Sequence, residues 1–121
     1  MKTRQESYQE IIANLSASTS DIKGVAIIST DGLMLESSLP GNMQKDKVAA
    51  ISAAMLGLSK KSVSEMSFGI LQEIQVKADG ATYVILSADA TTVLAVVAAA
   101  DANIGLVNIE SRNAAKQIAQ I

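Results

Sequence analysis

Hydrophobic positions between residues 44 and 66 recur with the period of an α-helix, and they do so on two sides of that helix. Large apolar residues stand at i, i+3, i+7 and i+10, and small residues form a second row on roughly the other side. The large row is Val48, Ile51, Met55 and Leu58, and the small row is Ala50, Ala53, Ala54 and Gly57. A helix that is apolar nearly all round is buried nearly all round. Because 121 residues provide few elements to cover both rows, we expect a second copy of the chain to cover the small row.

The remaining hydrophobic pattern predicts two more helices and five strands. Helical spacing indicates a first helix over residues 3–18 and a last helix that begins after a capping Asp101 or Asn103. Asp31-Gly32 and Asp79-Gly80 are typical of β-hairpin turns, because a tight turn needs a positive φ that this pair tolerates. The predicted strands cover residues 25–29, 33–38, 71–77, 82–87 and 92–99.

This order of elements predicts one α+β domain over residues 1–121, with the order αββαβββα. Since hairpins join the strands, the five-stranded sheet is antiparallel, and the long helix crosses over between its two parts. In strand 71–77, polar residues alternate with apolar ones, which is typical of an edge strand with one wet face. An open edge is a liability that pairing with a second copy removes.

The composition excludes several classes of function. The chain has neither histidine nor cysteine, which removes the usual general base, the usual metal ligands and thiol nucleophiles. It has no Gly-Lys-Ser or Gly-Lys-Thr of a P-loop, so we do not expect it to bind GTP itself. Its ten Lys and Arg are scattered in a chain of net charge −2, which argues against nucleic-acid binding. We expect no cofactor, no metal and no active site of its own.

The apolar segments are too short for a membrane protein. The polar N-terminus lacks the apolar core of a signal peptide. The most apolar run, residues 93–100, is far shorter than the roughly 20 residues that cross a bilayer. We therefore expect a cytoplasmic protein without direct membrane insertion.

Two motifs flank the long helix. Residues 24–32 read GVAIISTDG, and residues 94–97 read LAVV before a helix start at residues 102–107, ANIGLV. In this order around an Ala-rich crossover helix, the motifs resemble the roadblock family, which comprises the dynein light chain roadblock and its prokaryotic relatives. The resemblance runs from Ile22 to the C-terminus and implies a single roadblock-type domain.

The resemblance implies that the crossover helix lies on one face of the sheet and the terminal helices on the other. It also implies a homodimer, in which the crossover helices pack together and strand 71–77 pairs with its twin. Family members dock and regulate small Ras-like GTPases, some as GTPase-activating proteins, while others scaffold motor or polarity complexes without changing hydrolysis. Both functions stay open here. The expected dimer or partner interface comprises Ala50, Ala53, Ala54, Gly57, Lys61, Leu71, Glu73 and Gln75.

The charged residues have plain structural explanations beside functional ones. Arg112 has the chemistry of an arginine finger for a bound GTPase, but an amphipathic helix also carries such residues on its surface. Lys60 and Lys61 suit the helix C-terminus, where the dipole favours cations, although Lys61 is also a candidate partner contact. Lys45 and Lys47 stand at the helix start, where the dipole does not explain them.

Three aspartates, Asp31, Asp79 and Asp89, each fall in a predicted turn. Aspartate is common in turns because its side chain bonds to nearby backbone groups. Their spacing matches no calcium-binding loop. We interpret them as turn residues and not as a metal cluster.

Overall fold

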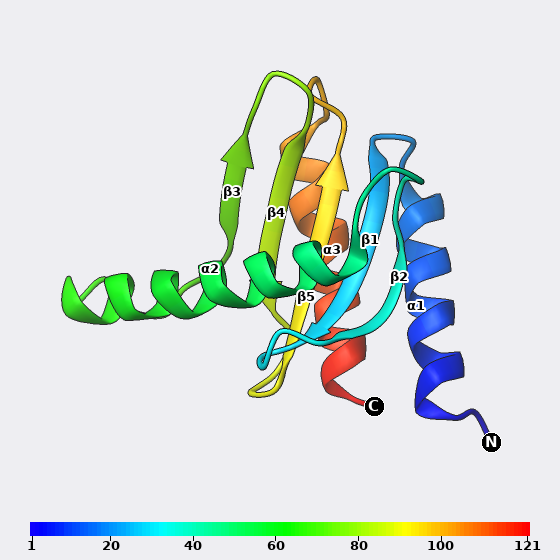
Figure 1. The fold of residues 1–121 in the computed structure, drawn as a ribbon, viewed down its shortest axis with the longest axis horizontal. Helices are drawn as coiled ribbons and strands as arrows, with labels where there is room; N and C mark the ends of the chain where they lie inside the picture. The colour runs from blue at the N-terminus through cyan, green and yellow to red at the C-terminus, as the bar shows by residue number, and fades with distance from the viewer.

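The computed structural model describes all 121 residues and contains three helices and one five-stranded antiparallel sheet (Figure 1). The helices are α1 (Arg4–Ser18), α2 (Lys45–Glu65) and α3 (Ile104–Ala119). The strands are β1 (Ile22–Ser29), β2 (Met34–Ser38), β3 (Ile74–Lys77), β4 (Thr82–Ser87) and β5 (Thr92–Ala98). Their order in the sheet is β2-β1-β5-β4-β3, so β2 and β3 are the two edges. The predicted element order and the antiparallel sheet are confirmed.

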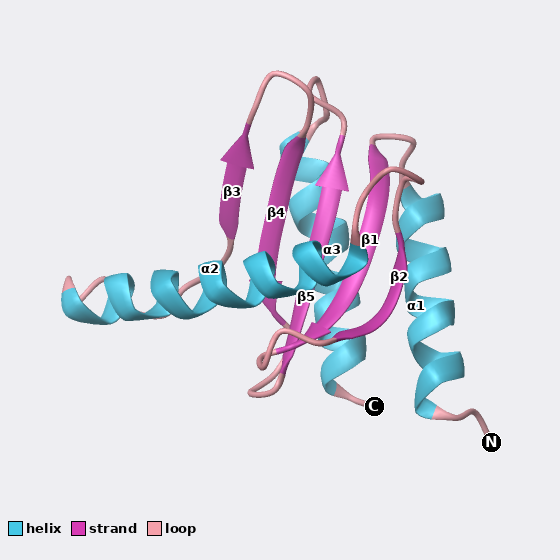
Figure 2. Ribbon diagram, in the orientation of Figure 1, coloured by secondary structure: helices cyan, strands magenta, loops and turns pink.

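The sheet separates two layers of helices, as Figure 2 shows. Helix α2 crosses one face, and α1 and α3 cover the other. Side chains alternate along each central strand, and this alternation divides the core into two clusters. In β4, Val84 and Leu86 belong to the cluster beneath α1 and α3, whereas Ile85 belongs to the cluster beneath α2. The expected placement of the helices on the two faces is confirmed.

Local signals fix the ends of the helices. Thr3 and Glu6 form a reciprocal capping box at the start of α1, and the bonds from Thr3 lower the pKa of the Glu6 carboxyl. Asn103 caps α3 by accepting a hydrogen bond from the Leu106 amide at 3.2 Å. Helix α2 ends in a Schellman-type turn, in which Ser67 has a φ of 57° and the Phe68 amide donates to the Val63 carbonyl at 3.0 Å.

The two Asp-Gly turns differ in backbone conformation. Gly32, between β1 and β2, has a φ of 90°, which favours glycine. Gly80, between β3 and β4, is not among the residues of positive φ. The hairpin at Asp79-Gly80 forms as predicted, but the expected positive φ is wrong there. That turn is closed instead by the Ala78 amide, which donates to the Ala81 carbonyl at 3.0 Å.

The predicted strand over residues 71–77 is shorter than expected and begins at Ile74. Ile74 pairs with Ile85, and no residue before it joins the ladder to β4. Leu71 packs instead against the core cluster beneath α2, and Glu73 forms an ion pair with Arg112 of α3. These two side chains therefore anchor residues 71–73 to the two layers of helices, next to the sheet edge.

Candidate interaction surface

Helix α2 buries only one narrow stripe against the sheet. Ala49, Ser52 and Leu56 are its buried residues, and they face the cluster formed by β1, β4 and β5. The expectation that this helix is buried nearly all round is wrong within one copy of the chain. Helix α2 is the only helix on this face of the sheet, so no other element of the chain covers its outer side. The two apolar rows therefore lie on the two flanks of the helix and are only partly covered.

The large row is divided between the sheet and the solvent. Val48 and Met55 are half-buried and pack against the cluster beneath α2. Ile51 and Leu58 are 54% and 68% exposed. Large apolar side chains with this exposure on one helix flank form a surface that favours association.

The small row lies on the other flank, toward the turn between β1 and β2. A Cβ built on Gly32 would lie 3.6 Å from the Cα of Ala50 and 3.9 Å from the Cβ of Ala53. The small size of these two alanines therefore leaves room for a turn of the same chain. Ala54, Gly57 and Lys61 are exposed, and a Cβ on Gly57 would meet no atom within 4 Å. Packing within the chain does not explain this glycine.

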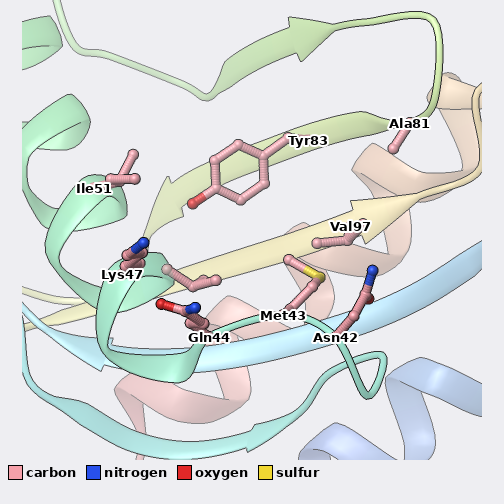
Figure 3. Close-up of a pocket in the computed structure, with 9 residues that line it drawn as sticks. Asn42, Met43, Gln44, Lys47, Ile51, Ala81, Tyr83 and Val97 are labelled. Atoms are coloured by element: carbon pink, nitrogen blue, oxygen red, sulfur yellow. The ribbon is translucent and has the colours of Figure 1, made fainter.

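A cavity of about 450 Å³ lies beside the first turns of α2, over the part of the sheet that α2 leaves open (Figure 3). Its walls combine the start of α2 with side chains from β4 and β5 and with the loop before the helix. We call it the α2 groove. It is lined by Asn42, Met43, Gln44, Lys47, Val48, Ile51, Ala81, Tyr83 and Val97.

Tyr83 forms the floor of the α2 groove, with its hydroxyl directed toward α2 (Figure 3). The Ser52 hydroxyl donates to the Val48 carbonyl at 2.6 Å, so the Tyr83 hydroxyl is the donor in the hydrogen bond between Tyr83 and Ser52. Burial raises the pKa of Tyr83 to about 12. Tyr83 is neutral at ordinary pH, as an unperturbed tyrosine also is, and its ring lines the groove.

The two edges of the sheet differ in how they are protected. Helix α1 covers β2, where the Gln5 side-chain amide donates to the Leu35 carbonyl at 3.4 Å and the Gln9 amide donates to Glu36 at 3.2 Å. On β3, Gln75 is exposed, and Val76 is exposed beside Tyr83, its partner on β4. No side chain donates to or accepts from the outer edge of β3, so this is the open edge of the sheet.

The C-terminal half of α2 extends past β3 and has no strand of its own chain beneath it (Figure 1). The chain leaves this end through a segment in which Phe68 and Ile70 are 72% and 87% exposed. Met66, at the helix end, is also exposed. Open apolar residues therefore follow the projecting end of α2, next to the open edge of β3.

Other candidate residues fall into structural roles. Arg112 pairs with Glu73 and is about half exposed, so the expected interface residue Glu73 contacts α3 of its own chain. Asp89 closes a turn by accepting from the Thr91 amide at 3.0 Å, and this bond lowers the pKa of the Asp89 carboxyl. No three acidic side chains gather in an arrangement that could hold a metal. No helix has the length and apolar character needed to cross a bilayer.

Comparison with known proteins matches the elements that form this surface to one protein family. Residues 8–98 match the Roadblock/LC7 domain, which includes α2 and all five strands. The chain belongs to the Roadblock/LC7 family. The Roadblock/LC7 match contains the first motif, at residues 24–32, and the strand part of the second, at residues 94–97, and it stops before the helix part at residues 102–107.

Relatives and solved structures agree with the Roadblock/LC7 assignment. The uncharacterized protein MJ1340 of Methanocaldococcus jannaschii is 30% identical over 101 residues, which cover 83% of this chain and 87% of that protein. An MglB with tetrameric arrangement has a TM-score of 0.89 at 17% identity, over 99% of this chain and 90% of that one. The gliding protein MglB of Thermus thermophilus has a TM-score of 0.88 at 16% identity, over 99% and 91%.

The sequence pattern did not reveal the α2 groove. Alternation along β4 places Tyr83 and Ile85 on one face, but it does not tell which of them α2 covers. The angle at which α2 crosses the sheet decides this, and side chains of both elements set that angle together. The one available signal was Tyr83 itself, because a tyrosine in an otherwise aliphatic strand places a polar group at the border of a core.

Proposed function

We propose that this chain is a homodimeric roadblock-type adaptor that docks a small Ras-like GTPase and regulates it. Membership of the Roadblock/LC7 family is the observation that carries the proposal. The resemblance in sequence assigns to this family both regulators and scaffolds of small Ras-like GTPases. The similarity in fold to MglB proteins, one of them a gliding protein, is consistent with such a role.

The open surfaces of β3 and α2 support the homodimer. Pairing two β3 edges around a two-fold axis would protect the backbone of both and would extend the sheet. Because α2 projects past β3, the same operation would bring the projecting end of each helix over the sheet of the other copy. Gln75 lies on the pairing strand, and Leu71 and Glu73 directly precede it.

The outer side of α2 supplies further proposed contact residues. Ala54, Gly57 and Lys61 are exposed there, and Ala50 and Ala53 continue the row toward the turn at Gly32. A docked GTPase would meet the small side of the helix at Ala54 and Gly57 and one cation, Lys61, on this side.

Regulation would act through the catalytic groups of the GTPase. This chain has no P-loop, histidine or cysteine, and its one arginine on α3, Arg112, is held by Glu73. An adaptor of this kind changes hydrolysis by ordering the switch loops of its partner. Stabilising one nucleotide state requires a difference in affinity between the two states.

The decisive experiment uses the small Ras-like GTPase encoded nearest to this chain, loaded with GDP or with a non-hydrolysable GTP analogue. We expect this chain to bind one state at least tenfold more tightly and to change the single-turnover rate of GTP hydrolysis relative to the GTPase alone. Binding that ignores the nucleotide, with an unchanged rate, would identify a structural scaffold. Absence of binding in both states would refute the proposed function.

A further inference from the structure

The chain contains two Asp-Gly pairs, and each of them joins two strands of the sheet. Asp31-Gly32 lies between β1 and β2, and Asp79-Gly80 lies between β3 and β4. In such a pair the backbone amide of the glycine can attack the side-chain carboxyl of the aspartate, because glycine has no side chain to block the approach and adopts most backbone angles. The attack requires that the two reacting groups be free to come together. The surroundings of each pair therefore decide whether it reacts in the folded chain.

The turn at Asp31-Gly32 is closed by several hydrogen bonds. The Gly32 amide donates to the Ser29 carbonyl at 2.9 Å, and the Leu33 amide donates to the Ser29 hydroxyl at 3.1 Å. The Ser29 amide also donates to the Leu33 carbonyl, at 2.9 Å. Gly32 lies close to α2, since a Cβ built on it would be 3.6 Å from the Cα of Ala50. The Gly32 nitrogen is therefore occupied, and the turn has little room to rearrange.

The turn at Asp79-Gly80 is much more open. Its one backbone hydrogen bond runs from the Ala78 amide to the Ala81 carbonyl, and the Gly80 amide donates to no group of the chain. The Asp79 carboxylate forms no ion pair, and both Asp79 and Gly80 are exposed. A Cβ on Gly80 would meet no atom within 4 Å, and the turn projects at one end of the sheet (Figure 1). The amide and the carboxyl of this pair are both free to react.

We propose that Asp79 isomerises spontaneously to isoaspartate in the folded chain, whereas Asp31 does not. The Gly80 nitrogen forms a bond to the Cγ of Asp79, and the amide proton leaves with the carboxyl hydroxyl as one molecule of water. The product is a five-membered succinimide ring. Water then adds to the ring carbonyl that belonged to the backbone of Asp79, and the bond from that carbon to the Gly80 nitrogen breaks. The chain now runs through the former side chain, without a net change in composition.

This reaction would alter the edge of the sheet, and the inference goes beyond the proposed function because it needs neither a second copy nor a GTPase. Isoaspartate adds one carbon to the backbone of the turn, between residues that the bond from Ala78 to Ala81 holds together. Strand β3 is the shortest of the five and pairs only with β4. Its ladder begins with the pair Lys77 and Thr82, directly beside the turn. A longer turn should therefore loosen β3.

Ageing of the wild-type chain at neutral pH and physiological temperature tests the proposed site. An endoproteinase that cleaves before aspartate but not before isoaspartate should leave a growing fraction of the Ala78–Asp79 bonds uncut, while it still cleaves before Asp31. A protein isoaspartate methyltransferase with a labelled methyl donor should label the peptide that contains position 79. We expect isoaspartate to form at least about tenfold faster at Asp79 than at Asp31, since the bonded turn must first open. Equal rates at the two sites would overturn the inference.

Ageing in guanidinium chloride separates the effect of the structure from that of the local sequence. Unfolding removes the hydrogen bonds of the Gly32 amide, so the rates at Asp31 and Asp79 should come to within about threefold of each other. A rate ratio that stays the same in the unfolded chain would show that the neighbouring residues, and not the two turns, cause the difference. That result would also overturn the inference.

Three variants complete the test. Asp79→Glu keeps the charge but should abolish the reaction, because the longer side chain would have to close a six-membered ring. Gly80→Ala should slow the reaction by about tenfold or more, because the added methyl group hinders the nitrogen. Asp31→Glu is the matched control and should leave the rate at Asp79 unchanged. Unchanged isoaspartate formation in Gly80→Ala would contradict attack by the Gly80 nitrogen.

Hydrogen exchange measures the consequence for β3. After ageing, β3 amides should exchange several-fold faster in the fraction that carries isoaspartate than in the unmodified fraction of the same sample. Asp79→Glu, aged in parallel, should keep the exchange rates of the fresh protein, and circular dichroism should show that all fresh variants fold. Equal exchange in the two fractions would overturn the loosening of β3. Because none of these measurements involves a partner, their failure would leave the proposed function standing.

Discussion

The Tyr83 hydroxyl donates a hydrogen bond to the Ser52 hydroxyl and thereby joins β4 to α2 at the border of the α2 groove. The Ser52 hydroxyl in turn donates to the Val48 carbonyl one helical turn earlier. This short chain of hydrogen bonds fixes the tyrosine ring across the open part of the sheet. The same hydrogen bonds mark the border between the part of the sheet that α2 covers and the part that lies open in the groove.

Removing either hydroxyl should destabilise the chain by a similar amount. We expect Tyr83→Phe and Ser52→Ala each to lower the free energy of unfolding by about 0.5–1.5 kcal/mol, the usual value of one hydrogen bond. The double variant should lose much less than the two single losses together, because both remove the same bond. Urea unfolding of the four proteins measures this cycle. Strict additivity would show that the two hydroxyls are not coupled.

The Tyr83 hydrogen bond should also change stability at high pH. The pKa of Tyr83 is raised from 10.0 to about 12 by burial, so the folded chain retains this proton after the unfolded chain has lost it. Stability from this group is fully present below pH 10 and is lost as the pH rises toward 12. Tyrosinate absorbance should show a late-titrating component that is absent in Tyr83→Phe. A Tyr83→Phe curve that keeps this component would contradict the assignment.

Substitutions at Gly57 test which row of α2 forms the proposed dimer contact. Its Cβ position is open, so Gly57→Ala should raise the free energy of unfolding by roughly 0.5–1 kcal/mol through helix propensity. Gly57→Leu should leave the dimer intact if the large row is the contact. If the small row packs closely, the added bulk should weaken the dimer by about 1–3 kcal/mol. Sedimentation of Gly57→Leu decides between the two rows.

The two hairpin glycines should respond differently to alanine. At Gly32, a φ of 90° strains any L side chain, so Gly32→Ala should cost about 1–2 kcal/mol. Gly80 has no positive φ and nothing within 4 Å of a Cβ, so Gly80→Ala should change stability by less than about 0.5 kcal/mol. Thermal unfolding of both variants tests the difference. Equal losses would mean that the two turns share one conformation.

Arg112 should be dispensable for regulation of a GTPase. Its guanidinium pairs with Glu73 on the surface, and a pair of this kind contributes about 0.2–1 kcal/mol. Arg112→Ala should therefore lower stability slightly and leave the effect on hydrolysis unchanged. Single-turnover hydrolysis measures this, with Glu73→Gln as the matched variant that frees the arginine. A loss of stimulation by a factor of roughly 10³ or more would instead identify Arg112 as an arginine finger.

Local rules determined most of the secondary structure of this chain. The helical period of residues 44–66 and the cap at Asn103 depend on neighbours within one or two turns, and both were predictable for that reason. The hairpins follow from Asp-Gly pairs between β-branched runs. Along β4 and β5 the side chains alternate between the two faces of the sheet, and the structure shows which helix layer each of them meets.

Strand β3 and the flanks of α2 required the tertiary structure. The sequence alternates from residue 71, but Leu71 and Glu73 find partners in the two helix layers, and these contacts compete with the sheet. The two apolar rows of α2 were visible in the sequence. Which of them faces the turn at Gly32 and which faces the α2 groove was not. Sequence alone thus determined which residues are apolar and how they repeat. The packing angle of α2 decided what they touch, because it depends on side chains that lie far apart along the chain.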